Sequence, residues 1–197
     1  MTRNERLELL ETMIPPDRIA HTLSVEKCAV DLASIHGADE GKASRAALLH
    51  DCAKQCKYGL KEFCEKYELM DVYEKFSRMD ISLVHAPLGT IVAQRMFGET
   101  DPSVLDAIEW HTTGRIGMSL MEKIIYLSDA IEPMRGDSPE LTQARALAQT
   151  DLDQALLLGM NMSIKSVLMK NKPLDQYTVT ARNHLLDMVL NNKLREV

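Results

Sequence analysis

The stretch Ala46-Ala47-Leu48-Leu49-His50-Asp51-Cys52-Ala53 places an imidazole and a carboxylate side by side in an apolar run. Ionisable groups among residues that tend to be buried oppose folding unless a partner or a bound cation neutralises them. An isolated His-Asp pair is most often a hydrogen-bonded core histidine beside a surface aspartate. This pair is not isolated, because further ionisable residues stand in similar surroundings elsewhere in the chain.

Four more candidate ligands lie in apolar segments. His111 ends a series of apolar residues at helical spacing, so its ring is expected to point into the core. His85 is expected to open a helix, with Pro87 in the first turn where its missing N–H has no partner. His21 lies in a long apolar segment, and Asp129 follows another. Together with His50 and Asp51, these residues indicate a shared site.

The residue types favour a metal site. Four imidazoles and two carboxylates are nitrogen and oxygen donors suited to iron, manganese or zinc. A single tetrahedral zinc leaves two of the six groups without a role, whereas two ions about 3.5–4 Å apart use them all, with a carboxylate as bridge. Spacing alone does not prove the second arrangement, because the groups come from five separate segments.

The order of these residues resembles that of the HD-domain metal-dependent phosphohydrolases, in the version with extra histidines that holds two metals. Longer strings narrow the resemblance to the YqeK family of bacterial proteins, over about residues 15–190. These strings are His50-Asp51-Cys52-Ala53-Lys54, His111-Thr112-Thr113-Gly114, Asp129-Ala130-Ile131-Glu132-Pro133-Met134-Arg135 and Thr180-Ala181-Arg182-Asn183.

The resemblance implies an all-α fold, an HD-domain helical bundle, as a single domain over residues 1–197. It also implies an enzyme that hydrolyses diadenosine tetraphosphate symmetrically to two ADP at a dinuclear site. The expected cofactors are two transition-metal ions, with iron first and manganese or zinc as alternatives. The implied metal ligands are His21, His50, Asp51, His85, His111 and Asp129.

The resemblance also gives roles to the remaining motif residues. Asp51 is expected to contact both ions and, with Lys54, to be catalytic. Lys54, Thr113, Gly114 and Arg135 are the expected substrate contacts, because ammonium, guanidinium, hydroxyl and backbone N–H groups bind phosphate oxygens.

Other polar residues have weaker assignments. Glu132 is expected to hold Arg135 or a histidine in place, which is the commoner role for such a residue. The roles of Arg182 and Asn183 stay open. His36 and His184 are expected to lie outside the site.

Two alternatives remain open at the level of sequence. The first is an HD-domain nucleotidase or pyrophosphohydrolase of other specificity, because such a site fixes the chemistry better than the substrate. The second is a non-catalytic nucleotide sensor whose metals anchor a ligand, although a complete set of ligands argues against it.

Length and composition fit one domain of ordinary composition. The 197 residues are 45% hydrophobic and 26% charged, with a net charge of −6. The acidic balance argues against broad nucleic-acid binding. No apolar run approaches the roughly 20 residues of a membrane span, and the N-terminus does not resemble a signal peptide, so a cytoplasmic location is the default.

The sulfur-containing residues carry no metal prediction. The four cysteines are expected to be free thiols, since no second pair at zinc-finger spacing accompanies Cys52 and Cys56. The segment with Met160, Met162 and Met169 suits either the core or a homodimer face.

Helical patterns cover nearly the whole chain, and no alternating valine-rich or aromatic run predicts a sheet. Gly37 and Gly98 are expected to stop helices, and Ser103 and Ser119 to lie near helix starts. The expected helices are 3–12, 16–36, 40–54, 59–67, 71–77, 85–97, 102–111, 119–131, 139–149, 151–171 and 178–192.

Overall fold

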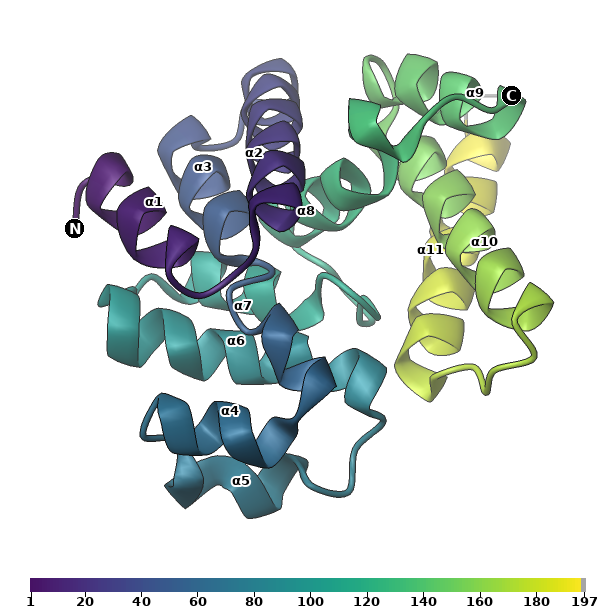
Figure 1. Cartoon of the computed structure of the whole chain (residues 1–197). Helices are drawn as coiled ribbons and strands as arrows, with labels where there is room; N and C mark the ends of the chain where they lie inside the picture. The colour runs from purple at the N-terminus through teal and green to yellow at the C-terminus, as the bar shows by residue number, and fades with distance from the viewer. Residues whose placement is uncertain (196–197) are drawn as a thin grey trace.

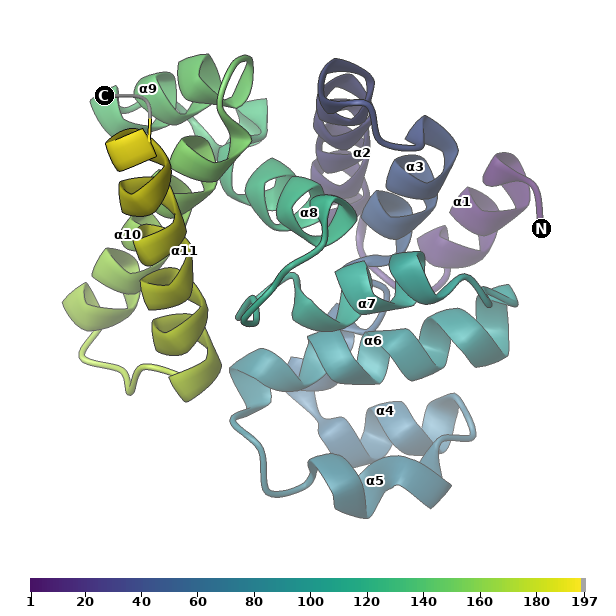
Figure 2. The same cartoon turned by 180° about the vertical axis from the view of Figure 1, so that it is seen from behind.

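Helices make up the regular structure of the chain in a computed structural model that describes residues 1–195 (Figures 1 and 2). No strand occurs in that range, so the all-α prediction is confirmed. Residues 196–197 of the domain predicted over 1–197 lie outside the described part. The α-helices are α1 (Arg3–Glu11), α2 (Pro16–His36), α3 (Glu40–Leu49), α4 (Leu60–Lys66), α5 (Met70–Phe76), α6 (Ile81–Phe97), α7 (Pro102–Trp110), α8 (Leu120–Ile131), α9 (Pro139–Ala148), α10 (Leu152–Met169) and α11 (Gln176–Arg195). Two 3-10 helices, η1 (Lys54–Tyr58) and η2 (Pro133–Arg135), complete the set.

Several helix ends follow local sequence signals. Gly37 and Gly98 cap α2 and α6 in the left-handed conformation, with φ of 72° and 66°, as predicted. Ser119 caps α8: its side chain accepts from the backbone N–H of Glu122, and the Glu122 carboxylate accepts from the Ser119 N–H. This reciprocal pair fixes where α8 starts, and therefore where Asp129 lies ten residues later.

Two predicted boundaries near the candidate site were wrong. The helix predicted over 40–54 ends at Leu49, and the chain turns through residues 50–53 before η1. The helix predicted from residue 85 begins at Ile81, because the Asp80 side chain accepts from the N–H of Ser82 and supplies a cap. Pro87 therefore lies inside α6 rather than in its first turn.

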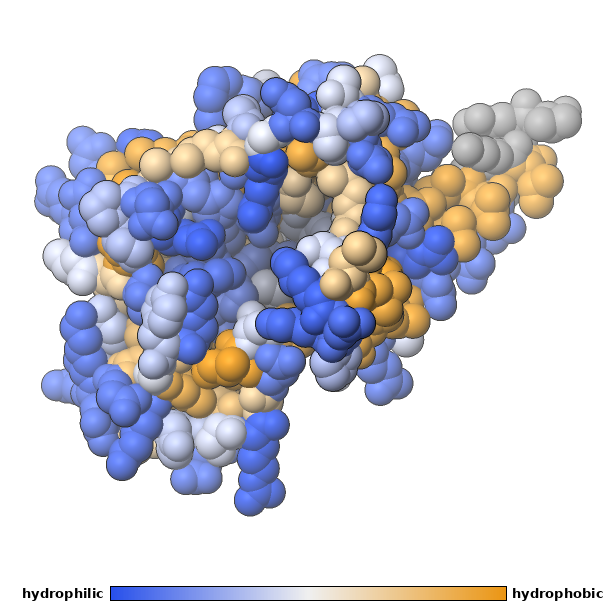
Figure 3. Space-filling view, turned by 45° about the vertical axis from the view of Figure 1, so that its right-hand side comes forward, coloured by the Kyte–Doolittle hydropathy of each residue, from blue (hydrophilic) through white to orange (hydrophobic). Residues whose placement is uncertain are grey.

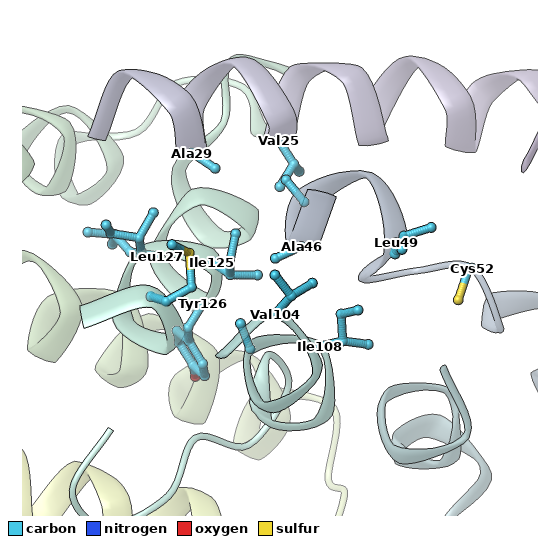
Figure 4. Close-up of a cluster of buried hydrophobic side chains, with 14 of the residues drawn as sticks. Val25, Ala29, Ala46, Leu49, Cys52, Val104, Ile108, Ile125, Tyr126 and Leu127 are labelled. Atoms are coloured by element: carbon cyan, nitrogen blue, oxygen red, sulfur yellow. The ribbon is translucent and has the colours of Figure 1, made fainter. Parts of the chain in front are cut away.

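The helices form two groups. In the larger, α2, α3, α7 and α8 pack around a common core, with α6 against α7 and η1, and α4 and α5 at the lower end in Figure 1. The core includes Val25, Ala46, Val104, Ile108 and Ile125, all fully buried (Figure 4). The candidate ligands lie on these helices or at their ends, so the packing of the core fixes their relative positions.

The smaller group contains α9, α10 and α11 and joins the larger one mainly through α8 (Figure 2). Small and apolar residues of α10 are buried at Leu152, Ala155, Leu156 and Gly159. A Cβ atom on Gly159 would lie 3.4 Å from Cδ1 of Leu127 and 3.8 Å from Cβ of Ala130, so α10 packs closely against α8 at this residue. The three helices thereby form one wall beside α8.

The methionine-rich segment is divided between core and surface. Met160 is fully buried, whereas the exposed fraction of Met169 is 77%.

None of the helices in residues 1–195 combines the length and apolarity that a membrane span needs.

Candidate metal centre

The structure brings the six predicted ligands together from five segments of the larger helical group. Five of the six are buried, and only Asp129 is partly exposed. They are His21 on α2, His50 and Asp51 at the end of α3, His85 on α6, His111 at the end of α7, and Asp129 on α8. The early end of α3 matters here, because it lets His50 and Asp51 leave the helix and face the same centre.

Asp51 occupies the middle of the cluster. Its Oδ2 lies 3.6 Å from Nε2 of His50, and its Oδ1 lies 3.4 Å and 3.6 Å from Nε2 of His85 and His111. The ligand atoms of His21, His50 and Asp51 lie within 4.8 Å of one another, as do those of Asp51, His85 and His111. A carboxylate shared by two such groups is what a bridge between two ions requires.

Asp129 closes the cluster on the side of α8. Its Oδ1 lies 3.1 Å from Nε2 of His21 and 4.0 Å from Nε2 of His50. Burial opposes ionisation of Asp129, but the contacts with His21, His50 and Arg135 lower its pKa. Asp129 is therefore a carboxylate, the form that binds a cation.

Hydrogen bonds fix the tautomers of three histidines. Nδ1 of His50 lies 2.6 Å from the carbonyl of Ala47, and Nδ1 of His111 lies 2.7 Å from the carbonyl of Ile108. Nδ1 of His21 lies 3.0 Å from the Glu132 carboxylate. Because carbonyls and carboxylates only accept, each Nδ1 carries the proton and each Nε2 presents a lone pair to the centre.

Three of the donor atoms that face the centre are buried and make no hydrogen bond within residues 1–195. They are Nε2 of His21, Nε2 of His50 and Oδ1 of Asp51. Buried polar atoms are normally paired, and such exceptions are characteristic of ligand atoms. With four imidazoles and two carboxylates, the residues fit divalent metal ions.

The pKa values suit this role. Burial lowers the pKa of His50 from 6.5 to about 4, and burial with the charge of His111 lowers that of His85 well below 6.5. Burial alone would raise the pKa of Asp51, but the neighbouring histidines and Lys54 hold it well below 3.8. At neutral pH His50 and His85 are therefore neutral imidazoles and Asp51 is a charged carboxylate, as metal binding requires.

These shifts predict how the stability of chelator-treated protein depends on pH. The folded pKa values of His50 and His85 are depressed, so the unfolded chain binds more protons as the pH falls below 6.5. The free energy of unfolding should therefore decrease by about 1.4 kcal/mol per pH unit for each histidine, down to about pH 4 for His50. Urea unfolding at about pH 7 and about pH 5 measures this. Equal stability at the two values would contradict the buried neutral state, and a His50→Gln variant should show a smaller decrease.

Three cations surround the two carboxylates. Lys54 Nζ lies 3.1 Å from Oδ1 of Asp51, and Arg18 Nη1 lies 3.1 Å from its Oδ2. Arg135 donates to the carboxylate and to the carbonyl of Asp129. Lys54 and Arg135 were predicted from the sequence, whereas Arg18 was missed. Its spacing of three residues before His21 places both side chains on one face of α2, and this was the available signal.

Glu132 fulfils the supporting role that the sequence predicted. It is 1% exposed, accepts from Nδ1 of His21, and takes 2.6 Å hydrogen bonds from the Ser24 hydroxyl and the Met134 N–H. Burial would raise its pKa, but these donors lower it. Glu132 therefore fixes the orientation of the His21 ring.

A cavity of about 550 Å³ opens onto the cluster between α6, α8 and α10. Its lining includes His85, His111 and Asp129 together with Lys54 and Arg135, and Ser163, Ser166 and Lys170 line the wall that α10 provides. Figure 3 shows a hollow on this side of the molecule, with hydrophilic side chains at its edges. A cavity of this size and charge can accommodate an anionic molecule of nucleotide size.

Thr113 and Gly114 lie away from this lining, and their predicted role in binding substrate stays a prediction. The neighbouring Thr112 lines the cavity instead. Thr113 is buried and its hydroxyl donates to the carbonyl of Gly114. Gly114 has φ of 67°, and a Cβ atom there would lie 3.0 Å from Cε of Met160, so this residue permits close packing of the 112–119 loop against α10.

Arg182 and Asn183, whose roles the sequence left open, and His36, which was expected outside the site, have partners away from the cluster. Arg182 donates from Nε to Asn161 and from Nη1 to Asn183. His36 contacts the carbonyl of Ala148 through Nε2, at 2.7 Å. The pKa of the Cys52 thiol is raised by burial, so this residue is a core thiol and not a reactive one.

Comparison with known proteins defines the class. The model of the HD domain matches residues 18–134, a range that contains all six clustered residues.

Similar proteins then give the particular family. The chain is 40% identical to a symmetrical bis(5'-nucleosyl)-tetraphosphatase of Halalkalibacterium halodurans and 37% identical to one of Bacillus subtilis. Each alignment covers 94% of this chain and 98% of the relative. A crystal structure from Clostridium acetobutylicum, of a "predicted HD superfamily hydrolase involved in NAD metabolism", matches with a TM-score of 0.82 and 36% identity, over 95% of this chain and 98% of that one. The chain belongs to the YqeK-type family of HD-domain symmetrical bis(5'-nucleosyl)-tetraphosphatases.

Proposed function

We propose that this chain is a metal-dependent phosphoanhydride hydrolase that cleaves diadenosine tetraphosphate symmetrically into two ADP. One observation carries the proposal: the six-residue donor cluster opens onto a cation-lined cavity of nucleotide size. Identity of 40% and 37% to proteins named for this activity, over nearly their whole length, supports the choice of substrate.

The residues assigned to metal binding are the six that the sequence predicted. His21, His50 and Asp129 lie on one side of Asp51, and His85 and His111 lie on the other. We assign Asp51 as the bridge between two ions. The nitrogen and oxygen donors suit iron, manganese and zinc, and the family resemblance favours iron.

The metals, when bound, lower the pKa of a water molecule and stabilise negative charge on phosphoryl oxygens. The chain's own residues orient the ligands, keep the bridging carboxylate charged and bind the substrate. Glu132 keeps the His21 ring oriented, and Asp51 holds its charge because its pKa is low. Lys54 and Arg135 line the cavity beside the cluster, and we assign them to bind the phosphates.

The bond changes are those of a hydrolysis. Water adds through its oxygen to one inner phosphorus, and the P–O bond to the oxygen that joins the second and third phosphates breaks. The leaving ADP departs with that bridging oxygen, the other ADP keeps the oxygen of the water, and the two protons of the water pass to the terminal phosphates of the products or to solvent. Cationic side chains stabilise the charge that develops on the phosphoryl oxygens.

A second candidate is hydrolysis of another nucleotide at the same centre, by a nucleotidase or pyrophosphohydrolase. The likeness to a structure described as involved in NAD metabolism favours keeping this alternative. The non-catalytic sensor that the sequence left open is less favoured, because a complete and charged donor set is present together with the phosphate-binding cations.

The test is incubation of the protein, loaded with Mn²⁺ or Fe²⁺, with a panel of dinucleoside polyphosphates and mononucleotides. ADP should be the only nucleotide product from diadenosine tetraphosphate. Release of AMP and ATP would contradict symmetrical cleavage. Robust turnover of mononucleotides without any turnover of dinucleotides would favour the nucleotidase.

A further inference from the structure

Symmetrical cleavage places a geometric demand on the protein. The scissile bond lies at the middle of the tetraphosphate, so a nucleoside with two phosphates extends from the centre in each of two directions. The cavity of about 550 Å³ between α8 and α10 provides for one of these halves. The other half needs a second place on the opposite side of the metal centre.

A second cavity, of about 460 Å³, lies between the α1–α2 turn and α4. Its lining includes Pro15 and Gln55, which flank the centre along the chain. Gln55 follows Lys54, a residue that lines the first cavity. Pro15 precedes Arg18 by one helical turn, and both Lys54 and Arg18 contact Asp51 at 3.1 Å. The second cavity therefore lies next, along two chain segments, to cations that contact the carboxylate assigned as the bridge.

The second cavity has the chemistry of a nucleoside site. Met13, Ile14 and Phe63 are nearly fully buried and give it an apolar floor. Gln55 and Glu62 add an amide and a carboxylate that can form hydrogen bonds with a base or a ribose. A few polar groups on a mainly apolar lining is the usual composition of a small-molecule site.

Tyr58 gives this cavity an aromatic edge. The residue is 76% exposed although it lines the cavity, so its ring is available to a ligand. Lys57 Nζ lies 4.6 Å from the ring centroid, and this cation covers one face of the ring. The opposite face can stack on a purine. Such stacking is the usual way that proteins bind an unpaired base without distinguishing which base it is.

We infer that the cavity between the α1–α2 turn and α4 binds the second nucleoside of the dinucleotide, with Tyr58 stacking on its base. This inference rests on the proposed function and adds to it the site of the second half. It predicts that a dinucleotide is preferred to a mononucleotide, because only a dinucleotide can fill both cavities.

The test compares two substrates that share the same scissile bond. Diadenosine tetraphosphate has a nucleoside at both ends, whereas adenosine 5'-tetraphosphate has one. In the Mn²⁺-loaded enzyme, Tyr58→Ala should raise KM for diadenosine tetraphosphate roughly tenfold, the order expected for loss of one base–aromatic stack. The kcat/KM for adenosine 5'-tetraphosphate should change by less than about twofold, because its single nucleoside uses the other cavity.

Tyr177→Ala serves as the matched control, since this tyrosine is 57% exposed and lies on α11, in the smaller group of helices, where its ring contacts that of Trp110. It should leave both kinetic constants unchanged. Equal effects of Tyr58→Ala on the two substrates, or no effect on either, would overturn the second nucleoside site. Failure of the wild-type enzyme to cleave diadenosine tetraphosphate would instead overturn the proposed function, and the inference with it.

Discussion

Replacing Asp51 by asparagine is expected to remove one or both metals and to lower turnover by at least roughly a hundredfold. The substitution keeps the size of the side chain and removes its charge. Asp51 is 2% exposed and lies within 3.6 Å of nitrogen atoms from three histidines. A neutral amide cannot offset the repulsion between two cations, so their separation is no longer fixed.

Metal analysis and initial rates on purified Asp51→Asn protein measure this effect. Asp31→Asn is the matched control, because Asp31 is exposed on α2 and forms an ion pair with Lys27 at the surface. It should keep full metal content and full activity. An Asp51→Asn protein with complete metal occupancy and near-normal turnover would show that Asp51 is not the bridge.

Replacing Glu132 by alanine is expected to weaken metal binding about 10- to 100-fold, although Glu132 itself is not assigned as a ligand. The change removes the acceptor for Nδ1 of His21, for the Ser24 hydroxyl and for the Met134 N–H. The His21 ring loses its fixed orientation and tautomer. Buried donors left without an acceptor also lower the free energy of unfolding, by about 1–3 kcal/mol each.

Metal titration monitored by activity and by thermal unfolding separates these two effects. Glu140→Ala is the control, because this glutamate is exposed at the start of α9, where it pairs with Lys165 at the surface and is remote from the cluster. Glu132→Gln should recover part of the metal affinity, since an amide oxygen still accepts one of the three hydrogen bonds. Wild-type metal affinity in Glu132→Ala would contradict its role in orienting His21.

The six donor residues could be predicted from the sequence because of their residue types and surroundings. Histidines and aspartates in apolar runs must be neutralised or paired, and this requirement is visible without coordinates. The structure confirms the convergence of all six residues, at distances such as 3.4 Å between Asp51 and His85. Their assignment as ligands stays a proposal that the Asp51 variant tests.

Other features depend on contacts between distant segments, which a single sequence does not display. Arg18 reaches Asp51 across 33 positions of the chain, and the cavity edge formed by Tyr58 depends on how η1 packs against the α1–α2 turn. The end of α3 at Leu49 was missed because His50 fits the helical pattern, although it is the residue at which the chain leaves the helix. Thr113 and Gly114 were chosen from a motif, yet the neighbouring Thr112 reaches the cavity.

Hydrolysis of diadenosine tetraphosphate in water enriched with ¹⁸O tests the central proposal most directly, because the isotope marks the phosphorus that water attacks. Mass spectrometry of the products of the metal-loaded enzyme should show ADP alone, with half of the ADP carrying one ¹⁸O atom on its terminal phosphate. This result follows if one water molecule cleaves the bond between the second and third phosphates. Label in AMP or ATP would contradict symmetrical cleavage and the placement of the substrate across the centre.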